Sequence, residues 1–261
     1  YDSKKSGGVT ISHLRFGPDP IRRPYLISKA DYIACHRPSY IYKYDLLRGL
    51  KPGGIFLLNS TWRKEDLDRV LPVGMKRKLA ALHAKFYIID AFEIAKEIGL
   101  GGRINMIMQT AFFKLANVID FDKAVALLKE SIKKTYGMKG DKIVNMNIAA
   151  VDAGINALVQ VQVKPEWKNL SGAAIQPPRA DVPDVIKNIL VPINAQKGDD
   201  LPVSAFKGME DGTMPLGTSK YEKRGIATHL PVWDKSECIQ CNRCSFVCPH
   251  AVIRPYLLNE D

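Results

Sequence analysis

Four cysteines near the end of the chain have the spacing of an iron–sulfur ligand set. Cys238, Cys241 and Cys244 follow one another with two residues between each pair, and Cys248 comes after three more residues and precedes a proline. In bacterial ferredoxins this C-x2-C-x2-C-x3-C-P run binds 4Fe-4S clusters, and its fourth cysteine ligates the other cluster where there are two. A structural zinc site usually has two ligand pairs separated by a longer loop. We therefore predict iron–sulfur ligation by these four cysteines, with zinc as the minor alternative.

The cysteine content is too low for a complete pair of clusters. A two-cluster module needs a second run of four cysteines, and the only other cysteine in the sequence is Cys35. Cys35 lies alone at the end of a predicted strand, where a cysteine usually acts as a small buried apolar residue. We expect the 4Fe-4S site to be incomplete in this chain, and the chain to be a fragment of a longer protein.

The positive charge lies entirely in the first part of the chain. Residues 1–150 contain 26 basic and 14 acidic residues, whereas residues 151–261 contain 12 and 13, so the net charges are +12 and −1. Near the start, Lys4, Lys5, Ser6 and Gly7 precede a predicted strand. Ammonium groups and flexible backbone amides suit phosphate oxygens, although an exposed loop explains the same residues.

Two classes of partner are not supported by the sequence. The basic residues form no aromatic-interleaved stripe and no recognised nucleic-acid motif, so nucleic-acid binding is only a minor alternative. No apolar run approaches the roughly 20 residues that a membrane helix needs. We expect a soluble chain with no nucleic-acid or membrane partner.

Predicted strands and helices alternate through the first 160 residues, which indicates an α/β fold with a layered, mostly parallel sheet. Continuous apolar runs such as IFLLN are typical of strands that are covered on both faces. Strands are predicted at residues 9–16, 32–35, 55–59 and 86–90. Helices are predicted at residues 42–50, 90–99, 103–118, 122–136 and 141–163. A further short helix is predicted after a cap at Ser60 or Thr61. At the start of the 90–99 helix, Asp90 and Glu93 resemble a capping box.

The second part of the chain has a different composition. Six prolines precede residue 151 and ten follow it, which indicates an extended, turn-rich region. We predict an α/β domain at residues 1–163, a Pro/Gly-rich linker at 164–230 with one helix-sized apolar run at 183–193, and an iron–sulfur module that starts at 231 and continues to 261.

Five stretches together resemble the pyruvate:ferredoxin (flavodoxin) oxidoreductases, which are large single-chain 2-oxoacid oxidoreductases. They are YDSKKSGGVTISHLRFG from Tyr1, LKPGGIFLLNST from Leu50, RINMIMQTAFFKL from Arg103, YEKRGIA from Tyr221 and the cysteine run. The resemblance implies a gamma-type domain without its opening strand, the EKR segment, and the first part of a ferredoxin-like domain.

The family resemblance also implies a function. It implies oxidative decarboxylation of pyruvate with coenzyme A to acetyl-CoA and CO2, with electrons passing to ferredoxin or flavodoxin. Thiamine diphosphate, Mg²⁺ and the catalytic residues would belong to domains missing here, so this piece alone is expected to be inactive. It would supply iron–sulfur ligands and contacts to coenzyme A, with Lys4, Lys5, Ser6 and Gly7 as the candidate contacts.

The implied partners are the remaining domains of a homodimeric parent enzyme, and the implied location is the cytoplasm or another reducing compartment of an anaerobic organism or organelle. The alternative is a standalone iron–sulfur electron-transfer or adaptor subunit whose basic domain docks an acidic protein. That alternative predicts salt-sensitive binding to the partner and no effect of coenzyme A.

Overall fold

The computed structural model describes residues 9–172, 181–222, 232–249 and 251–257. The chain divides into two compact units. The main unit runs from Thr10 to Tyr221, and the cysteine unit consists of Glu222–Asp261 with Tyr1–Val9. Among the described residues, no helix has the length and apolar character needed to cross a lipid bilayer.

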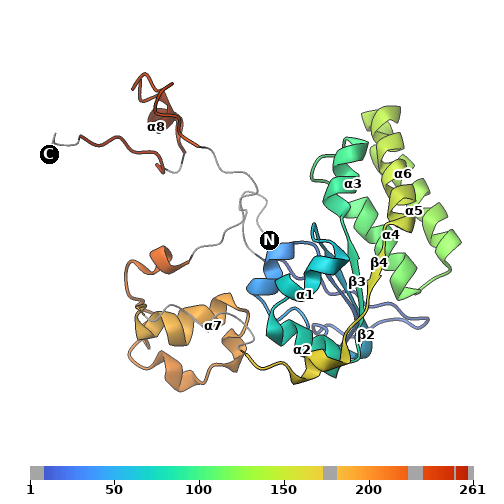
Figure 1. The fold of residues 1–261 in the computed structure, drawn as a ribbon, viewed down its shortest axis with the longest axis horizontal. Coiled ribbons are helices and arrows are strands. Elements are labelled where there is room, and N and C mark those ends of the chain that lie inside the picture. Colours follow the sequence, from blue (N-terminus) through green and yellow to red (C-terminus); the bar gives the residue numbers. More distant parts are fainter. Residues whose placement is uncertain (1–8, 173–180, 223–231, 250, 258–261) are drawn as a thin grey trace. The chain divides into compact units, whose positions relative to one another are not determined.

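The main unit is built on a four-stranded sheet with the strand order β1-β2-β3-β4 (Figure 1). β1 pairs in parallel with β2, β2 pairs in parallel with β3, and β4 is antiparallel to β3. The strands are β1 Ala30–Cys35, β2 Leu50–Asn59, β3 Lys85–Ile89 and β4 Val159–Val161. The fold is therefore α/β with a mostly parallel sheet, as predicted.

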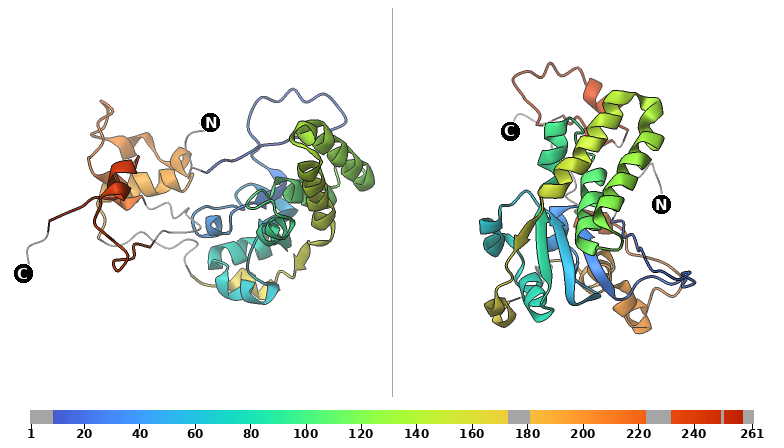
Figure 2. Two further views of the ribbon diagram at one scale, coloured as in Figure 1. Left: turned by 90° about the horizontal axis from the view of Figure 1, so that it is seen from above. Right: turned by 90° about the vertical axis from the view of Figure 1, so that its right-hand side faces the viewer.

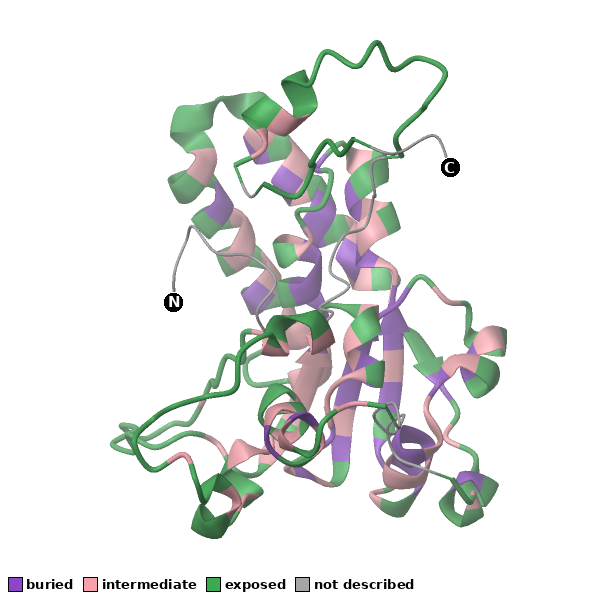
Figure 3. Cartoon of the chain, turned by 90° about the vertical axis from the view of Figure 1, so that its left-hand side faces the viewer, coloured by how far each residue is buried: buried purple, intermediate pink, exposed green. Residues whose placement is uncertain are grey.

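Helices cover both faces of this sheet (Figures 1 and 2). Phe56 and Phe86 face a core that contains α2 residues and Trp167, whereas Leu57 and Ile89 face a core formed with α3, α4 and α6. Because successive side chains of a strand point to opposite faces, both faces need apolar residues. Figure 3 shows the buried residues gathered in the strands and on the inner sides of the helices.

The α-helices vary in length from four to sixteen residues. Those of the main unit are α1 Leu67–Val70, α2 Val73–Ala81, α3 Ala91–Ile98, α4 Asn105–Ala116, α5 Phe121–Tyr136, α6 Asp141–Asn156 and α7 Val191–Asn194; α8, Arg243–Val247, belongs to the cysteine unit. Short 3-10 turns lie at Pro38–Tyr42, Lys64–Asp66, Gly137–Lys139, Pro165–Asn169, Gly198–Asp200, Val203–Phe206 and Thr218–Tyr221, and a π-helical turn lies at Ile186–Leu190.

A glycine allows α4 and α6 to pack closely. An added Cβ at Gly154 of α6 would lie 3.1 Å from the carbonyl oxygen of Ile107 and 3.2 Å from the Cβ of Thr110, both in α4. Real Cβ atoms rarely come that close to a neighbour, so a larger residue would push the two helices apart. Helix α5 completes the layer, because Ile132 of α5 packs with Val144 and Val151 of α6.

Asn59 ties together the carboxyl ends of the parallel strands. Its side chain is fully buried, its Nδ2 donates to the carbonyl of His36 at 3.0 Å, and its Oδ1 accepts from the amide of Ala91 at 2.9 Å. His36 follows β1, Asn59 ends β2, and Ala91 is the first residue of α3 after β3. One amide side chain therefore fixes three chain segments at one edge of the sheet.

Several local predictions are confirmed. The predicted strands at 32–35, 55–59 and 86–90 correspond to β1, β2 and β3. Strand β3 ends at Ile89, one residue before the predicted end. Helix α3 begins as the capping pattern predicts, because the Asp90 side chain accepts from the Glu93 amide. It ends at Gly99, whose φ of 85° is in the left-handed region that glycine adopts without strain.

The predicted strand at residues 9–16 is wrong. This segment has no regular secondary structure, and the amide of Ile27 donates to the His13 side chain rather than to a paired backbone. A strand needs a neighbouring backbone to satisfy its amides and carbonyls. The alternating residue pattern is present, but among the described residues no strand lies next to it.

The predicted helix at residues 42–50 is also wrong. Strand β2 already begins at Leu50 and includes the Pro52-Gly53-Gly54 sequence that was expected to end a helix. The preceding residues form successive turns, in which the Arg48 amide donates to Asp45 and the Leu50 amide donates to Leu47. These turns connect the 3-10 turn at Pro38–Tyr42 directly to β2, so no α-helix forms here.

Two further predictions need correction. Helix α6 ends at Asn156, not at residue 163, because Val159–Val161 pairs with β3 as a fourth strand. The predicted cap at Ser60 or Thr61 does not form. The Ser60 hydroxyl accepts from the Trp62 amide in a local turn, and the following 3-10 turn has no side-chain cap.

The start of the linker is fixed to α1 and α2 by a cluster around Asp68. Its carboxylate accepts from Lys164 at 2.6 Å and from the Trp167 indole at 3.0 Å, and the nearly buried Lys76 donates to its backbone carbonyl at 2.8 Å. The hydrogen bond from Lys164 is the main cause of the lowered pKa of Asp68. Arg77 adds hydrogen bonds to the carbonyls of two later linker residues, Leu170 and Gly172.

The Asn59 contacts generate the first prediction. Asn59→Ala removes both hydrogen bonds and leaves the His36 carbonyl and the buried amide of Ala91 without this partner. We expect the free energy of unfolding to fall by about 2–4 kcal/mol. Urea denaturation followed by circular dichroism measures this, with Asn145→Ala on the exposed side of α6 as the matched control. Equal stability of the two variants would contradict the role given to Asn59.

Candidate functional site

The cysteine unit winds tightly between its cysteines. Gln240 and Asn242 have φ angles of 56° and 57°, in the left-handed region that non-glycine residues seldom adopt. Gln240 lies between Cys238 and Cys241, and Asn242 precedes the short helix α8, which contains Cys244. Two left-handed residues therefore fall within the first three cysteines of the run, immediately before α8.

Backbone amides in this unit are directed at sulfur atoms. The amide of Gln240 donates to the Cys238 sulfur and is the main cause of its lowered pKa, with a further contribution from the Trp233 side chain. The amide of Val252 donates to the Cys248 sulfur at 3.3 Å. Such contacts favour the thiolate form, which is the form that binds metal.

The donor set fits an iron–sulfur cluster, but the sulfurs are not gathered around a common centre. Cys238, Cys241 and Cys244 are exposed and Cys248 is half-buried. In the part of the chain that the structure describes, no three Cys, His, Asp or Glu side chains are arranged to hold a metal ion. The four thiols are therefore accessible ligands of the right type and spacing that still have to close around a cluster.

Cys35 is chemically separate from the cysteine run. It lies in the core of the main unit with only 4% of its surface exposed, and its thiol donates to the carbonyl of Arg37 at 3.1 Å. Burial raises the pKa of this thiol to about 11. Cys35 is thus a buried packing residue, as expected from the sequence.

The predicted phosphate-contact residues Lys4, Lys5, Ser6 and Gly7 lie outside the described residues. The structure instead reveals a basic pocket that sequence reasoning missed. It has a volume of about 420 Å³ and is lined by Arg103, Asn105, Tyr136, Lys139, Ile143 and Asn147. The sequence signal was weak, because these residues come from three separate places that only folding brings together.

The basic pocket has the character of an anion site. Arg103 and Lys139 make no ion pair with any described residue, and no acidic side chain lines the pocket. Asn105 is the first residue of α4, so the N-terminus of this helix lies at the pocket, whereas the amide of Ile143 in the first turn of α6 already donates to the Gly140 carbonyl at 3.1 Å. Unpaired cations and helix N-termini both favour bound anions. Lys139 also lies 5.5 Å from the centre of the Tyr136 ring.

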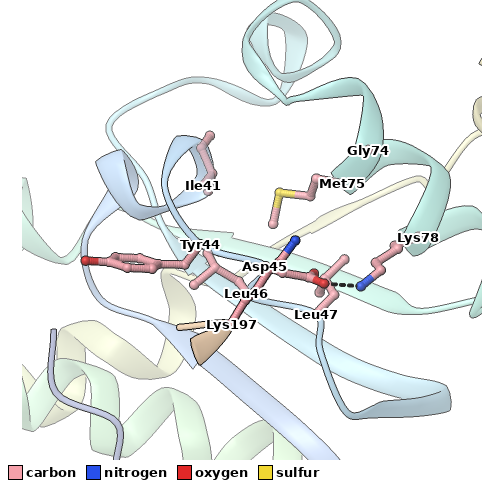
Figure 4. A pocket seen from close by; sticks show the side chains of 9 residues that line it. All are labelled: Ile41, Tyr44, Asp45, Leu46, Leu47, Gly74, Met75, Lys78 and Lys197. Carbon is pink, nitrogen blue, oxygen red and sulfur yellow. Dashed lines mark hydrogen bonds and ion pairs between the residues drawn. The ribbon is translucent and has the colours of Figure 1, made fainter. Parts of the chain in front are cut away.

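A second pocket, shown in Figure 4, is too small for a cofactor. Its volume is about 50 Å³, and Ile41, Leu47 and Met75 form much of its apolar lining. Lys78 is paired with Asp45 at its edge (Figure 4), so these two charges already satisfy each other. Such a cavity has room for at most a few water molecules.

Three family profiles match successive parts of the chain. Residues 1–157 match the family described as pyruvate ferredoxin/flavodoxin oxidoreductase. Residues 173–227 match EKR, a domain of unknown function, and residues 231–254 match the 4Fe-4S binding domain. The last match includes all four cysteines of the run.

Individual relatives match almost the whole chain. The pyruvate-flavodoxin oxidoreductase of Enterobacter agglomerans is 58% identical over 261 residues, which is 100% of this chain and 22% of the relative. The pyruvate:ferredoxin oxidoreductase of Moorella thermoacetica is 60% identical over 257 residues, 98% of this chain and 22% of the relative. The pyruvate-flavodoxin oxidoreductase of Klebsiella pneumoniae is 56% identical over 261 residues, which is 100% of this chain and 22% of the relative. The chain thus spans about a fifth of these relatives.

The contrast between Cys35 and the cysteine run can be tested by thiol labelling. We expect iodoacetamide at pH 8 to alkylate the four clustered cysteines of the native apo chain and to leave Cys35 unmodified, since it is both buried and neutral below its pKa of about 11. Unfolding in urea should expose Cys35 to the reagent. Mass spectrometry of tryptic peptides distinguishes the labelled sites. Rapid labelling of Cys35 in the native chain would contradict its burial in the core of the main unit.

Proposed function

The chain belongs to the pyruvate ferredoxin/flavodoxin oxidoreductase family, and we propose that it supplies iron–sulfur ligands and an anion-binding surface to an enzyme that oxidises pyruvate. The supporting observation is the four-cysteine run, which lies within the 4Fe-4S binding match of a chain whose first 157 residues match the oxidoreductase family. The reaction would be oxidative decarboxylation of pyruvate with coenzyme A, with ferredoxin or flavodoxin as the electron acceptor.

Cys238, Cys241, Cys244 and Cys248 are the proposed cluster ligands. A 4Fe-4S cluster held there would carry single electrons. The chain's own contribution is to supply thiolates and to direct backbone amides at them, which stabilises negative charge on sulfur. If Cys248 serves a second cluster, the first needs a fourth ligand from a further cysteine run, because Cys35 is buried in the core of the main unit.

The basic pocket supports the proposed role of coenzyme A. Coenzyme A carries a pyrophosphate and a ribose phosphate, and Arg103 and Lys139 offer two unpaired cations beside the N-terminus of α4. The net charge of +12 on residues 1–150 would attract such a ligand over a longer range. Lys4, Lys5, Ser6 and Gly7 stay proposed as additional contacts.

Other features of the complete enzyme are proposed from family membership alone. Thiamine diphosphate, Mg²⁺ and the catalytic residues would lie in the regions of the longer relatives that this chain does not match. A homodimeric parent, a cytoplasmic or otherwise reducing location and an anaerobic setting belong to the same proposal.

Cluster loading tests the role of the cysteine run. After anaerobic incubation with iron and sulfide, we expect the 261-residue chain to show little stable cluster absorbance. A longer version that adds a second run of four cysteines should load two clusters. Cys241→Ser in that longer version should lower its iron content, whereas the control Cys35→Ala should not. Full loading of the short chain, or no effect of Cys241→Ser, would contradict the proposed ligand set.

Titration calorimetry with coenzyme A tests the basic pocket. Loss of a charge-assisted contact costs about 1.5–3 kcal/mol, so Arg103→Ala or Lys139→Ala should weaken binding by roughly tenfold or more. Lys142→Ala is the matched control, since this exposed lysine of α6 does not line the pocket. Equal affinities for all variants would place coenzyme A elsewhere. Salt-sensitive binding of an acidic protein without any coenzyme A effect would favour the adaptor alternative.

A further inference from the structure

Residues 10–29, named here the arm, expose an unusual amount of apolar surface. The segment forms a long loop that projects from the sheet of the main unit (Figure 2, left). Six large side chains on it are between 48% and 72% exposed: Ile11, Leu14, Phe16, Ile21, Tyr25 and Leu26. So many large exposed apolar side chains on one short segment favour a surface that another molecule covers.

The arm has internal contacts that keep its two limbs together. The Ile27 amide donates to His13 Nδ1 at 3.1 Å, and the Arg15 guanidinium donates to the Arg23 carbonyl and lies 5.1 Å from the centre of the Tyr25 ring. Three prolines between the limbs and within the second limb restrict the backbone further. A segment that is ordered in advance loses less conformational entropy when it docks.

An unsatisfied polar group lies near the base of the arm. Phe16 of the arm contacts Phe112 with ring centres 5.5 Å apart, and Tyr32 of β1 contacts the same Phe112 at 5.2 Å. The Tyr32 hydroxyl is buried and has no hydrogen-bond partner among the described residues. Buried hydroxyls nearly always have a partner. This hydroxyl is enclosed by the chain's own atoms, so it lies beneath the base of the arm and is not part of the exposed apolar surface.

The charge of the arm selects the kind of partner. It contains four basic residues and one acidic residue, Asp19, and neither Arg22 nor Arg23 forms an ion pair with any described residue. A second copy of the arm would place like charges opposite each other, which is unfavourable. A surface that carries carboxylates around an apolar groove complements both the charge and the exposed side chains.

We propose that the arm docks into an acidic-rimmed apolar groove on the part of these longer proteins that lies outside the matched segment. The relatives match 98–100% of this chain at 58–60% identity, yet it covers only 22% of their length, so a covering surface in the same polypeptide is available to them. The inference depends on membership of the family. It depends neither on cluster binding nor on coenzyme A.

The test compares the isolated chain with a chimaera in which it replaces the matching segment of the Moorella thermoacetica relative. Hydroxyl-radical footprinting should label Leu14 and Leu26 in the isolated chain and label them roughly fivefold less in the chimaera, because an interface core excludes water. Met138, which is fully exposed on the main unit, should be labelled equally in both. Equal labelling of Leu14 and Leu26 in the two proteins would overturn the proposal.

Variants give a second, independent readout. The double variant Leu14→Ser/Leu26→Ser should leave the melting temperature of the isolated chain unchanged and lower that of the chimaera, whereas the matched control Leu216→Ser should change neither. A fall in the isolated chain alone would assign these side chains to its own core and overturn the proposal.

The isolated chain also distinguishes the other occupants. By analytical ultracentrifugation it should be a monomer, and it should not bind vesicles of phosphatidylcholine and phosphatidylserine. Self-association that the double variant abolishes would identify a second copy as the occupant, and vesicle binding that the double variant abolishes would identify an anionic lipid surface. Either result would overturn the proposal without affecting the cluster or coenzyme A tests.

Discussion

The arrangement of the main unit depends on a buried amide at the carboxyl edge of its parallel strands. Asn59 bonds to the chain after β1 and to the first residue of α3, so the end of β2 cannot move independently of its neighbours. This side chain is costly to bury unless both its donor and its acceptor are paired. The sheet that it locks carries α3, α4 and α6 on one face, and the basic pocket is built at the ends of helices in that layer.

Local signals in the sequence predicted the parts of the fold that are determined locally. The apolar runs of β2 and β3 and the Asp90 and Gly99 ends of α3 each carry their own signal. Residues 9–16 and Val159–Val161 show the limit, because pairing with another backbone decides whether a strand forms. The first has the strand pattern without a partner among the described residues, and the second is a three-residue segment whose partner, β3, lies far away in the sequence.

The two candidate sites differ in the same way. Four cysteines within eleven residues are visible in the sequence because a cluster needs thiolates at short spacing. The basic pocket combines Arg103 before α4 with Tyr136 and Lys139 at the junction of α5 and α6. Each of these residues alone resembles an ordinary surface residue, and only the packing of the helices makes them a site.

The cysteine run is proposed to provide sulfur ligands to an iron–sulfur cluster in a longer protein. Iron K-edge X-ray absorption of the iron-loaded chimaera with the Moorella thermoacetica relative, compared between the parent sequence and Cys238→Ser, tests it most directly. Iron with only sulfur neighbours, together with iron–iron scattering that decreases in the variant, is the predicted result. An unchanged spectrum, or iron bound mainly by nitrogen and oxygen, would contradict the claim.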